Sequence, residues 1–313
     1  MQTHHFHEGE VALQRSVGMA DKMAPVAAQV IRDHMPLQHR DFYPLLPYLI
    51  VGSQGPRRQI WASVLSGPIG FVQSPTETQL CVHSLPRAGD PLADTLQTGQ
   101  ALGLLGLQAH TRRRNRANGV VHRRGAADWA LTVKESFGNC PKYIHPREAF
   151  YVPPAHGSPS ITPPVKILTH LDARTTALLR QADTAFIASA HPDAGISHNA
   201  AHGVDVSHRA GPAGFISVQG DTLFMPDYRG NFFFNTLGNL HLNAFAGLTV
   251  MDYAHGHLLQ LSGRVEIVTH PDASLAHETP RGLRIWVDEA RWHEQAVPLR
   301  WQDHATESQL TRG

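Results

Sequence analysis

Two short stretches in the second half of the chain carry side chains of the kinds that hold a phosphate group. Both adjoin apolar, strand-like runs, and together they offer a hydroxyl, an imidazole, arginine forks and a turn whose backbone N–H groups could face an anion. The six residues are Ser207, His208, Arg209, Arg229, Gly230 and Asn231. Plainer interpretations stay open, with Ser207 as a strand hydroxyl, Arg229 as a solvated turn residue and Gly230 as a turn glycine.

Two further groups of residues could extend such an anion site. Asn235 and Asn239 follow in "NFFFNTLGNL", where they could contact a ligand or could simply cap and hydrogen-bond the local backbone. In the first half, "TRRRNR" (111–116) concentrates basic side chains, which indicates one local anion rather than a general basic surface, because the whole chain carries a net charge of only +1. Its four arginines are Arg112, Arg113, Arg114 and Arg116.

Other reactive side chains do not form a recognisable motif. The chain has 22 histidines, and "HHFH" (His4, His5, His7) and "HGH" (His255, His257) could be imagined as metal ligands. No cysteine or carboxylate stands at a matching spacing, so we expect no metal site. We expect Cys140 to be a small buried residue rather than a nucleophile. Dinucleotide, Walker, G-x-S-x-G and H-E-x-x-H motifs are absent from the sequence, and the residues alone identify no catalytic group.

Length and composition limit the class of protein. With 313 residues and 42% hydrophobic residues, the chain is long enough for two domains with packed cores. No apolar run approaches the roughly 20 residues of a membrane-spanning helix. The start "MQTHHFHEGE" does not resemble a secretory signal, and two cysteines are too few for a disulfide framework. We expect a cytoplasmic protein with free thiols, no nucleic-acid partner and no membrane.

The heptapeptide "SGPIGFV" (66–72) returns as "AGPAGFI" (210–216), 144 positions later. Five of the twelve positions in 61–72 are identical at this offset, where unrelated sequences would share about one. The same offset, without a gap, relates Ser63 to Ser207, Gly67 to Gly211, Gly70 to Gly214, Phe71 to Phe215, Gly103 to Gly247 and Gly119 to Gly263. The pattern favours an internal duplication over two unrelated turns that both use Gly-Pro, and it predicts equal strand and turn lengths in both copies.

The elements that must position these residues are mainly β-strands. Short β-prone runs bounded by Gly, Pro or Asp occur in both halves, and helical spacing of apolar residues is seen at 18–35 and 171–183. We therefore predict a mainly β chain with flanking helices, of the α+β class. The expected segments are an N-terminal helical segment (1–35), a first unit (36–150), a proline-rich linker (151–165) and a second unit (166–313).

One ordered series of motifs resembles a known family. The stretch "GVDVSHRAGPAGFISVQGDTLFMPDYRGNFFFNTLGNL" (203–240), followed by "AGLTVMD" and "LLQLSGRVEI", is similar to the pyridoxamine 5′-phosphate oxidase-like family of the FMN-binding split-barrel superfamily. In the first half, "WASVLSGPIGF", "GLLGLQAHTRRRNRANG", "SFGNCPKYIHPR" and "FHEGE" resemble segments of the same group. The resemblance implies a six-stranded split barrel per unit, with FMN in a cleft between two barrels. Because the unit is repeated, it implies two tandem barrels that form an intrachain pseudo-dimer.

The resemblance also implies the function. By this resemblance the chain is expected to be an FMN-dependent oxidoreductase that transfers hydride or electrons from a donor to an acceptor. The expected donor is NAD(P)H, a small reduced substrate or a separate electron-transfer protein. The eight residues of the second half are then cofactor-binding, and the four arginines of 111–116 reach across the interface toward cofactor or substrate, unless that run is a solvated hairpin. A non-enzymatic flavin- or haem-binding module is the alternative function, and a homodimer the alternative assembly.

The first unit departs from the family pattern at the expected phosphate site. At the offset of 144, Leu65 stands opposite Arg209, and Leu85 and Arg87 stand opposite Arg229 and Asn231. A second, equivalent phosphate site in the first unit is therefore not expected.

Overall fold

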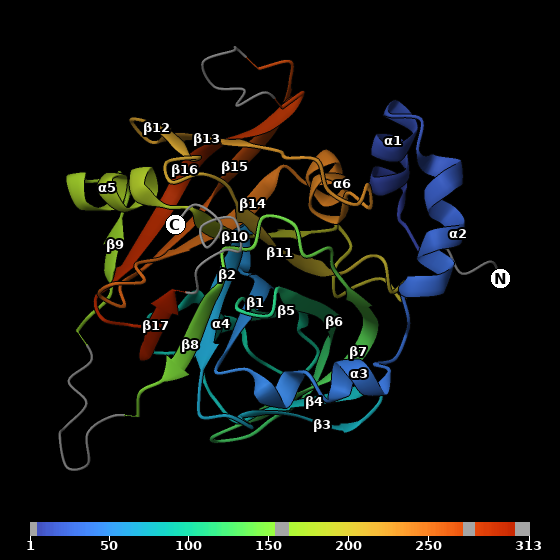
Figure 1. Ribbon diagram of the computed structural model, residues 1–313, viewed down its shortest axis with the longest axis horizontal. Coiled ribbons are helices and arrows are strands. Elements are labelled where there is room, and N and C mark those ends of the chain that lie inside the picture. Colours follow the sequence, from blue (N-terminus) through green and yellow to red (C-terminus); the bar gives the residue numbers. More distant parts are fainter. Residues whose placement is uncertain (1–4, 154–162, 272–278, 304–313) are drawn as a thin grey trace, which may run out of the picture.

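The structure is a computed structural model that describes residues 5–153, 163–271 and 279–303. It is mainly β, as the sequence predicts, and contains two large antiparallel sheets, one in each half of the chain, with helices at their periphery (Figure 1). The greater part of the predicted linker, residues 154–162, lies outside the described residues. Within the described residues, no helix combines the length and the apolar character needed to cross a membrane.

The first sheet has seven strands in the order β2-β1-β5-β6-β7-β4-β3. It encloses an apolar core that includes Leu49, Val51, Leu104 and Trp129, all essentially inaccessible to solvent. Its strands are β1 (Tyr48–Gln54), β2 (Ile60–Ser66), β3 (Val72–Thr76), β4 (Gln79–Val82), β5 (Ala101–Gln108), β6 (Arg113–Arg124) and β7 (Trp129–Gly138).

The second sheet repeats this order as β11-β10-β14-β15-β16-β13-β12, with β9 added alongside β16. It surrounds a separate core that includes Ile187, Phe215, Leu259 and Ile285. Its strands are β9 (Lys166–Leu168), β10 (Thr184–Ala190), β11 (Val204–Ala210), β12 (Ser217–Gln219), β13 (Thr222–Pro226), β14 (Phe245–Met251), β15 (Leu258–Thr269) and β16 (Arg281–His293).

The sequence offset of 144 relates most strands of the first sheet to their counterparts in the second but fails for β1 and β7. It carries β2 onto β11, residue for residue, and nearly superimposes the bounds of β5 on β14 and of β6 on β15. The prediction of equal turn lengths is wrong at β1 and β7. The β10–β11 loop (191–203) is longer than the β1–β2 connection (55–59), so β1 begins at residue 48 but β10 at residue 184.

The two sheets pack against each other through reciprocal contacts. Strand β1 lies against β10, β5 against β11, and β2 against β14. A third apolar core between the sheets includes Ile50, Ile60, Phe186 and Val206. Two glycines at equivalent positions allow this approach, because a Cβ on Gly103 would lie 2.5 Å from the Val204 carbonyl oxygen, and one on Gly247 would lie 2.5 Å from the Ile60 carbonyl oxygen.

Two helices pack together beside the second sheet; the first falls within the predicted N-terminal helical segment (1–35), and the second was not predicted. Helix α1 (Glu8–Ser16) begins at a capping box in which the His7 side chain accepts a hydrogen bond from the Gly9 N–H. It packs on α6 (Asn235–Leu242) (Figure 1). The contact is close, since a Cβ on Gly9 would lie 2.3 Å from the Gly238 carbonyl oxygen. The N-terminal helix is therefore fixed to the second half of the chain.

The remaining elements are short. The predicted helices at 18–35 and 171–183 are confirmed as α2 and α5, although α2 ends early because Arg32 bridges to Ser136 in β7. A two-stranded sheet joins β8 to β17. Their bounds are α2 (Ala20–Val30), α3 (Leu37–Arg40), η1 (Tyr43–Leu45), η2 (Pro56–Arg58), α4 (Pro91–Thr95), α5 (Ala173–Gln181), β8 (Arg147–Tyr151) and β17 (Leu299–Asp303).

The close approach of the sheets makes Gly103 sensitive to substitution. We expect Gly103→Ala to lower the free energy of unfolding by about 3 kcal/mol, because the added methyl group meets fixed backbone of the opposite sheet. Gly203→Ala is the matched control, since its Cβ would meet nothing nearer than 3.6 Å, and it should change stability by less than about 0.5 kcal/mol. Urea unfolding of both variants measures the difference. Equal stabilities would contradict the described packing.

Candidate functional site

A cavity of about 730 Å³ lies where the two halves of the chain meet. Strand β6 of the first sheet contributes to it, as do β11, the segment that joins β13 to α6, the first turn of α6, and the start of β16. Nine of the residues singled out in the sequence line it together: Arg114, Arg116, Ser207, His208, Arg209, Arg229, Gly230, Asn231 and Asn235.

Three of the residues singled out in the sequence do not line the cavity. Asn239 is buried within α6, where its Nδ2 donates to the Ser189 hydroxyl at 3.1 Å. Arg112 lies in the turn between β5 and β6, and the Arg113 guanidinium sits 4.9 Å from the centre of the Phe42 ring. Because side chains alternate along a strand, Arg114 and Arg116 of β6 share the face that meets the cavity, and Arg113 does not.

Arg116 is the most highly connected residue of the site. Its buried guanidinium pairs with the Asp205 carboxylate at 2.6 Å, and it donates to the Ser207 hydroxyl at 2.5 Å and to Asn235 Oδ1 at 3.0 Å. The Asn235 amide in turn donates to Glu10 of α1 at 2.6 Å. Burial lowers the pKa of Arg116, and the Asp205 charge opposes that shift. Arg116 of the first half therefore links β11 and α6 directly, and it links α1 through Asn235.

Arg114 is held more loosely and points the other way along the cavity. Its Nη2 donates to the Cys140 carbonyl oxygen at 2.5 Å, and its Nη1 lies 3.0 Å from His208 Nδ1. Burial, together with the nearby Arg116, lowers the pKa of Arg114 to about 10, so the group stays charged at neutral pH. Burial and the Arg114 charge hold the pKa of His208 well below its usual range. His208 is therefore neutral, and its Nδ1 accepts a hydrogen bond from Arg114 Nη1.

Arg209 and Arg281 share one carboxylate. Asp227 lies 2.7 Å from Arg209 Nη1 and 3.5 Å from Arg281 Nε. Among the described residues that line the cavity, Asp227 is the one acidic side chain, against six arginine or lysine side chains: Arg114, Arg116, Lys142, Arg209, Arg229 and Arg281.

Four of these arginines have a buried Nε atom that makes no hydrogen bond: Arg114, Arg116, Arg209 and Arg281, of which Arg281 Nε still lies 3.5 Å from Asp227. An unsatisfied buried donor costs about 1–3 kcal/mol, more when charged. The excess of guanidinium charge around the cavity favours an anion there.

Aromatic rings border the basic part of the cavity. Tyr143 and Tyr228 are stacked with ring centres 5.4 Å apart, and Arg281 lies 4.7 Å from the centre of the Phe234 ring. Phe232 and Phe234 both have φ near +60°, in the left-handed region that such residues rarely adopt. The left-handed conformation of these two residues turns the chain sharply before α6 begins. Flat apolar faces next to arginines suit a planar ring that carries a phosphate.

Several residues of the cavity were not identified in the sequence. Asp227, Tyr228 and Tyr143 lie within stretches that resemble the family but were not singled out as site residues. Arg281 lies in β16, which was not predicted as a strand. The interpretation of Cys140 as a buried residue is wrong, because it is partly exposed and lines the cavity; both cysteines are free.

The equivalent place in the first half is a closed polar network. At the offset of 144, Gln260 stands for Arg116 and Leu65 for Arg209. The Gln260 amide donates to the Ala62 carbonyl oxygen at 2.9 Å and lies 3.2 Å from the Ser63 hydroxyl, and its Oε1 lies 2.6 Å from His293 Nε2. These groups satisfy one another, so this place offers an anion neither charge nor free donors.

Comparisons with known proteins add little to this geometry. No protein-family model matches the chain, and no curated protein does. HupZ of Group A Streptococcus is 12% identical, with 43% of this chain and 100% of that chain covered and a TM-score of 0.31.

Two further solved structures match at a similar level. A FAD-binding protein of Mesorhizobium loti is 15% identical, with coverages of 42% and 97% and a TM-score of 0.29. A protein of the pyridoxinephosphate oxidase family from Clostridium acetobutylicum is 11% identical, with coverages of 42% and 92% and a TM-score of 0.28. Because scores this low establish no common fold, the site is interpreted from its own residues.

The buried ion pair predicts a large effect of removing one partner. Arg116→Met should lower the free energy of unfolding by about 3–5 kcal/mol, because Asp205 is left buried and uncompensated. Arg116→Met combined with Asp205→Leu should recover part of that loss in a double-mutant cycle. Arg124→Met, at the exposed end of the same strand, is the control and should have little effect. Equal effects of Arg116→Met and Arg124→Met would contradict the assignment.

Proposed function

We propose that the chain binds flavin mononucleotide in this cavity. The observation that carries the proposal is the charge of the cavity, whose described lining has six arginine or lysine side chains and a single carboxylate. A flavin phosphate has nearly two negative charges and needs donors of this kind. Arg114 and Arg209 would hold the phosphate, and Tyr143 and Tyr228 would border the ring.

The size and the lining of the cavity fit such a ligand. A volume of about 730 Å³ falls within the range of roughly 300–1,000 Å³ that is usual for cofactor sites. Arg116 is already paired with Asp205, so its role is to position Ser207 and Asn235 rather than to neutralise the ligand. The sequence has no dinucleotide fingerprint, which favours FMN over a flavin with an adenylate.

The two halves are proposed to be tandem copies of one split-barrel unit that pair as a dimer does, within one chain. Their common strand order, their reciprocal contacts and the equivalent glycines Gly103 and Gly247 support this. We place the units at 36–150 and 166–313, preceded by 1–35 and joined by 151–165. Since only one of the two equivalent places is basic, one FMN per chain is expected.

The proposed activity is that of an FMN-dependent oxidoreductase. Bound FMN exchanges hydride or single electrons through its own ring. The residues of this chain would bind the phosphate, orient the ring and keep the site partly closed to water. Candidate donors are NAD(P)H, a small reduced substrate or a separate electron-transfer protein.

Flavin content and affinity test the proposal. Protein purified without additives should release FMN, one per chain, with the paired near-UV and blue absorption bands of a flavin rather than the single intense band of haem. Arg209→Ala should weaken FMN binding about 10- to 150-fold, corresponding to about 1.5–3 kcal/mol, because a charge-assisted hydrogen bond is lost. Arg209→Lys should recover only part of the affinity.

Arg174→Ala is the matched control, because Arg174 lies on α5 and pairs with the exposed Glu294, outside the cavity. Fluorescence titration of the flavin-free protein gives the dissociation constants. Colourless protein that fails to bind added FMN would overturn the proposal. An Arg209→Ala variant that binds FMN as tightly as the Arg174→Ala control would remove Arg209 from the site.

A further inference from the structure

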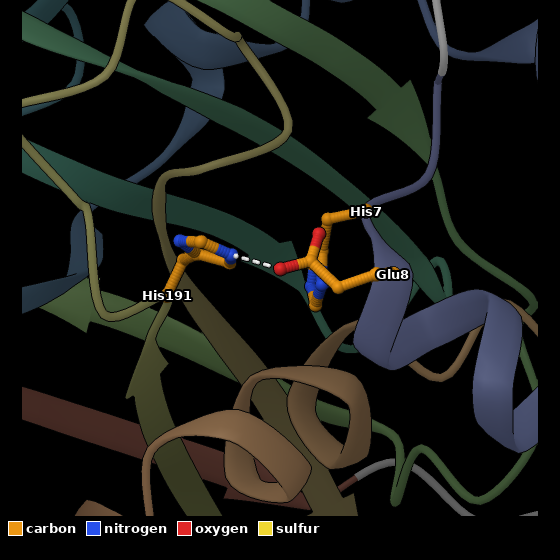
Figure 2. A group of neighbouring side chains, drawn as sticks. All are labelled: His7, Glu8 and His191. Carbon is orange, nitrogen blue, oxygen red and sulfur yellow. Dashed lines mark hydrogen bonds and ion pairs between the residues drawn. The ribbon is translucent and has the colours of Figure 1, made fainter.

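A second cluster of polar side chains lies at the N-terminal end of α1. His7 and Glu8 begin this helix, and His191 directly follows β10 in the second half (Figure 2). One nitrogen or oxygen of each lies within 4.8 Å of one from both others. His202 lies beside the group, and its ring stacks on that of His191 with the centres 3.8 Å apart.

Three imidazoles face one carboxylate in this cluster. Glu8 Oε1 lies 3.4 Å from His191 Nε2, and Glu8 Oε2 lies 3.8 Å from His202 Nε2. The rings of His7 and His191 meet edge to face at 5.0 Å. A neutral imidazole and a carboxylate are the donor set that zinc and similar divalent ions take from proteins.

Two imidazoles of the cluster are buried, whereas the Glu8 side chain is exposed. His7 and His191 are 3% and 2% exposed. The Nε2 atom of His7 and the Nδ1 atom of His202 are inaccessible and make no hydrogen bond. A buried imidazole nitrogen without a hydrogen bond is suited to a metal once its proton is displaced.

The loop that carries this cluster has no counterpart in the first half. His191 and His202 lie at the two ends of the β10–β11 loop (191–203), whereas 55–59 joins the equivalent strands β1 and β2 without a histidine. The longer β10–β11 loop of the second half therefore supplies the two histidines that lie near α1.

We propose that His7, Glu8 and His191 bind one divalent metal ion of the zinc type. The site would tie the N-terminal helix to the second sheet, and through the contact of α1 with α6 it would support the element whose first turn lines the anion cavity. The ion would have a structural role there.

Binding requires two local changes that the structure specifies. His7 Nδ1 accepts a hydrogen bond from the Gly9 N–H at 3.2 Å, and His191 Nδ1 accepts one from the Asp193 N–H at 3.1 Å. Each ring therefore carries its proton on Nε2, the nitrogen that faces the cluster. An ion at Nε2 moves that proton to Nδ1 or releases it, so these two backbone contacts must turn away.

Zinc binding by the untagged full-length protein tests the proposal. After treatment with a chelator, the protein should bind one Zn²⁺ per chain in calorimetry, and its melting temperature should rise with Zn²⁺ concentration. His191→Gln should abolish this binding. Glu8→Gln, at an exposed side chain that folding does not need, should weaken it at least tenfold. FMN content should be unchanged in Glu8→Gln, which separates this test from that of the flavin site.

His255→Gln is the matched control, since His255 belongs to an exposed histidine and aspartate cluster in a turn. It should bind Zn²⁺ as the unaltered protein does. No stoichiometric Zn²⁺ binding, or equal binding by Glu8→Gln and the unaltered protein, would overturn the proposal. So would loss of binding in His255→Gln alone.

Discussion

The buried pair of Arg116 and Asp205 is the interaction on which the rest of the structure depends. It joins the two halves at the point where Gly103 lets the sheets approach to backbone contact, and it places Ser207 and Asn235 at the edge of the cavity. A buried ion pair costs desolvation and adds little net stability unless its remaining donors are satisfied. Here Nη1 donates to Asp205 and Asn235 and Nη2 donates to Ser207, while Nε makes no hydrogen bond. The ion pair therefore fixes the geometry of the site as well as the interface.

The two halves share one strand order but differ in the side chains at equivalent positions. The second half has Arg209 where the first has Leu65. Ser207 bonds to the charged Arg116, whereas the equivalent Ser63 bonds to the neutral Gln260. The basic cavity therefore needs both halves but occurs at one of the two equivalent places. The same asymmetry extends to the loops, because the longer connection after β10 carries the histidines that meet α1. A chain with two unequal halves can hold one ligand where two identical halves would hold two.

The sequence predicts the fold class and most of the cavity residues because short, local sequence patterns indicate both. Gly-Pro turns and apolar runs mark the strands, and the motif around Arg209 lies on one strand with its neighbours. Residues that meet only through packing were not predictable. Arg281 comes from a segment without a motif, and the stacking of Tyr143 on Tyr228 depends on packing between segments far apart in sequence. Arg113 and Arg114 could not be separated before the register of β6 was known. His7 and His191 are far apart in sequence, so the spacing of "HHFH" gave no indication of the cluster.

If the phosphate of FMN lies among arginines from both halves of the chain, those arginines must determine its protonation. The ³¹P NMR spectrum of the protein with FMN bound measures this. A free monoester takes up its second proton at a pKa of about 6, whereas guanidinium groups hold a bound phosphate in the dianionic form. We expect a resonance whose position stays constant between pH 8 and about pH 5. A resonance that shifts near pH 6, as that of free FMN does, would contradict it.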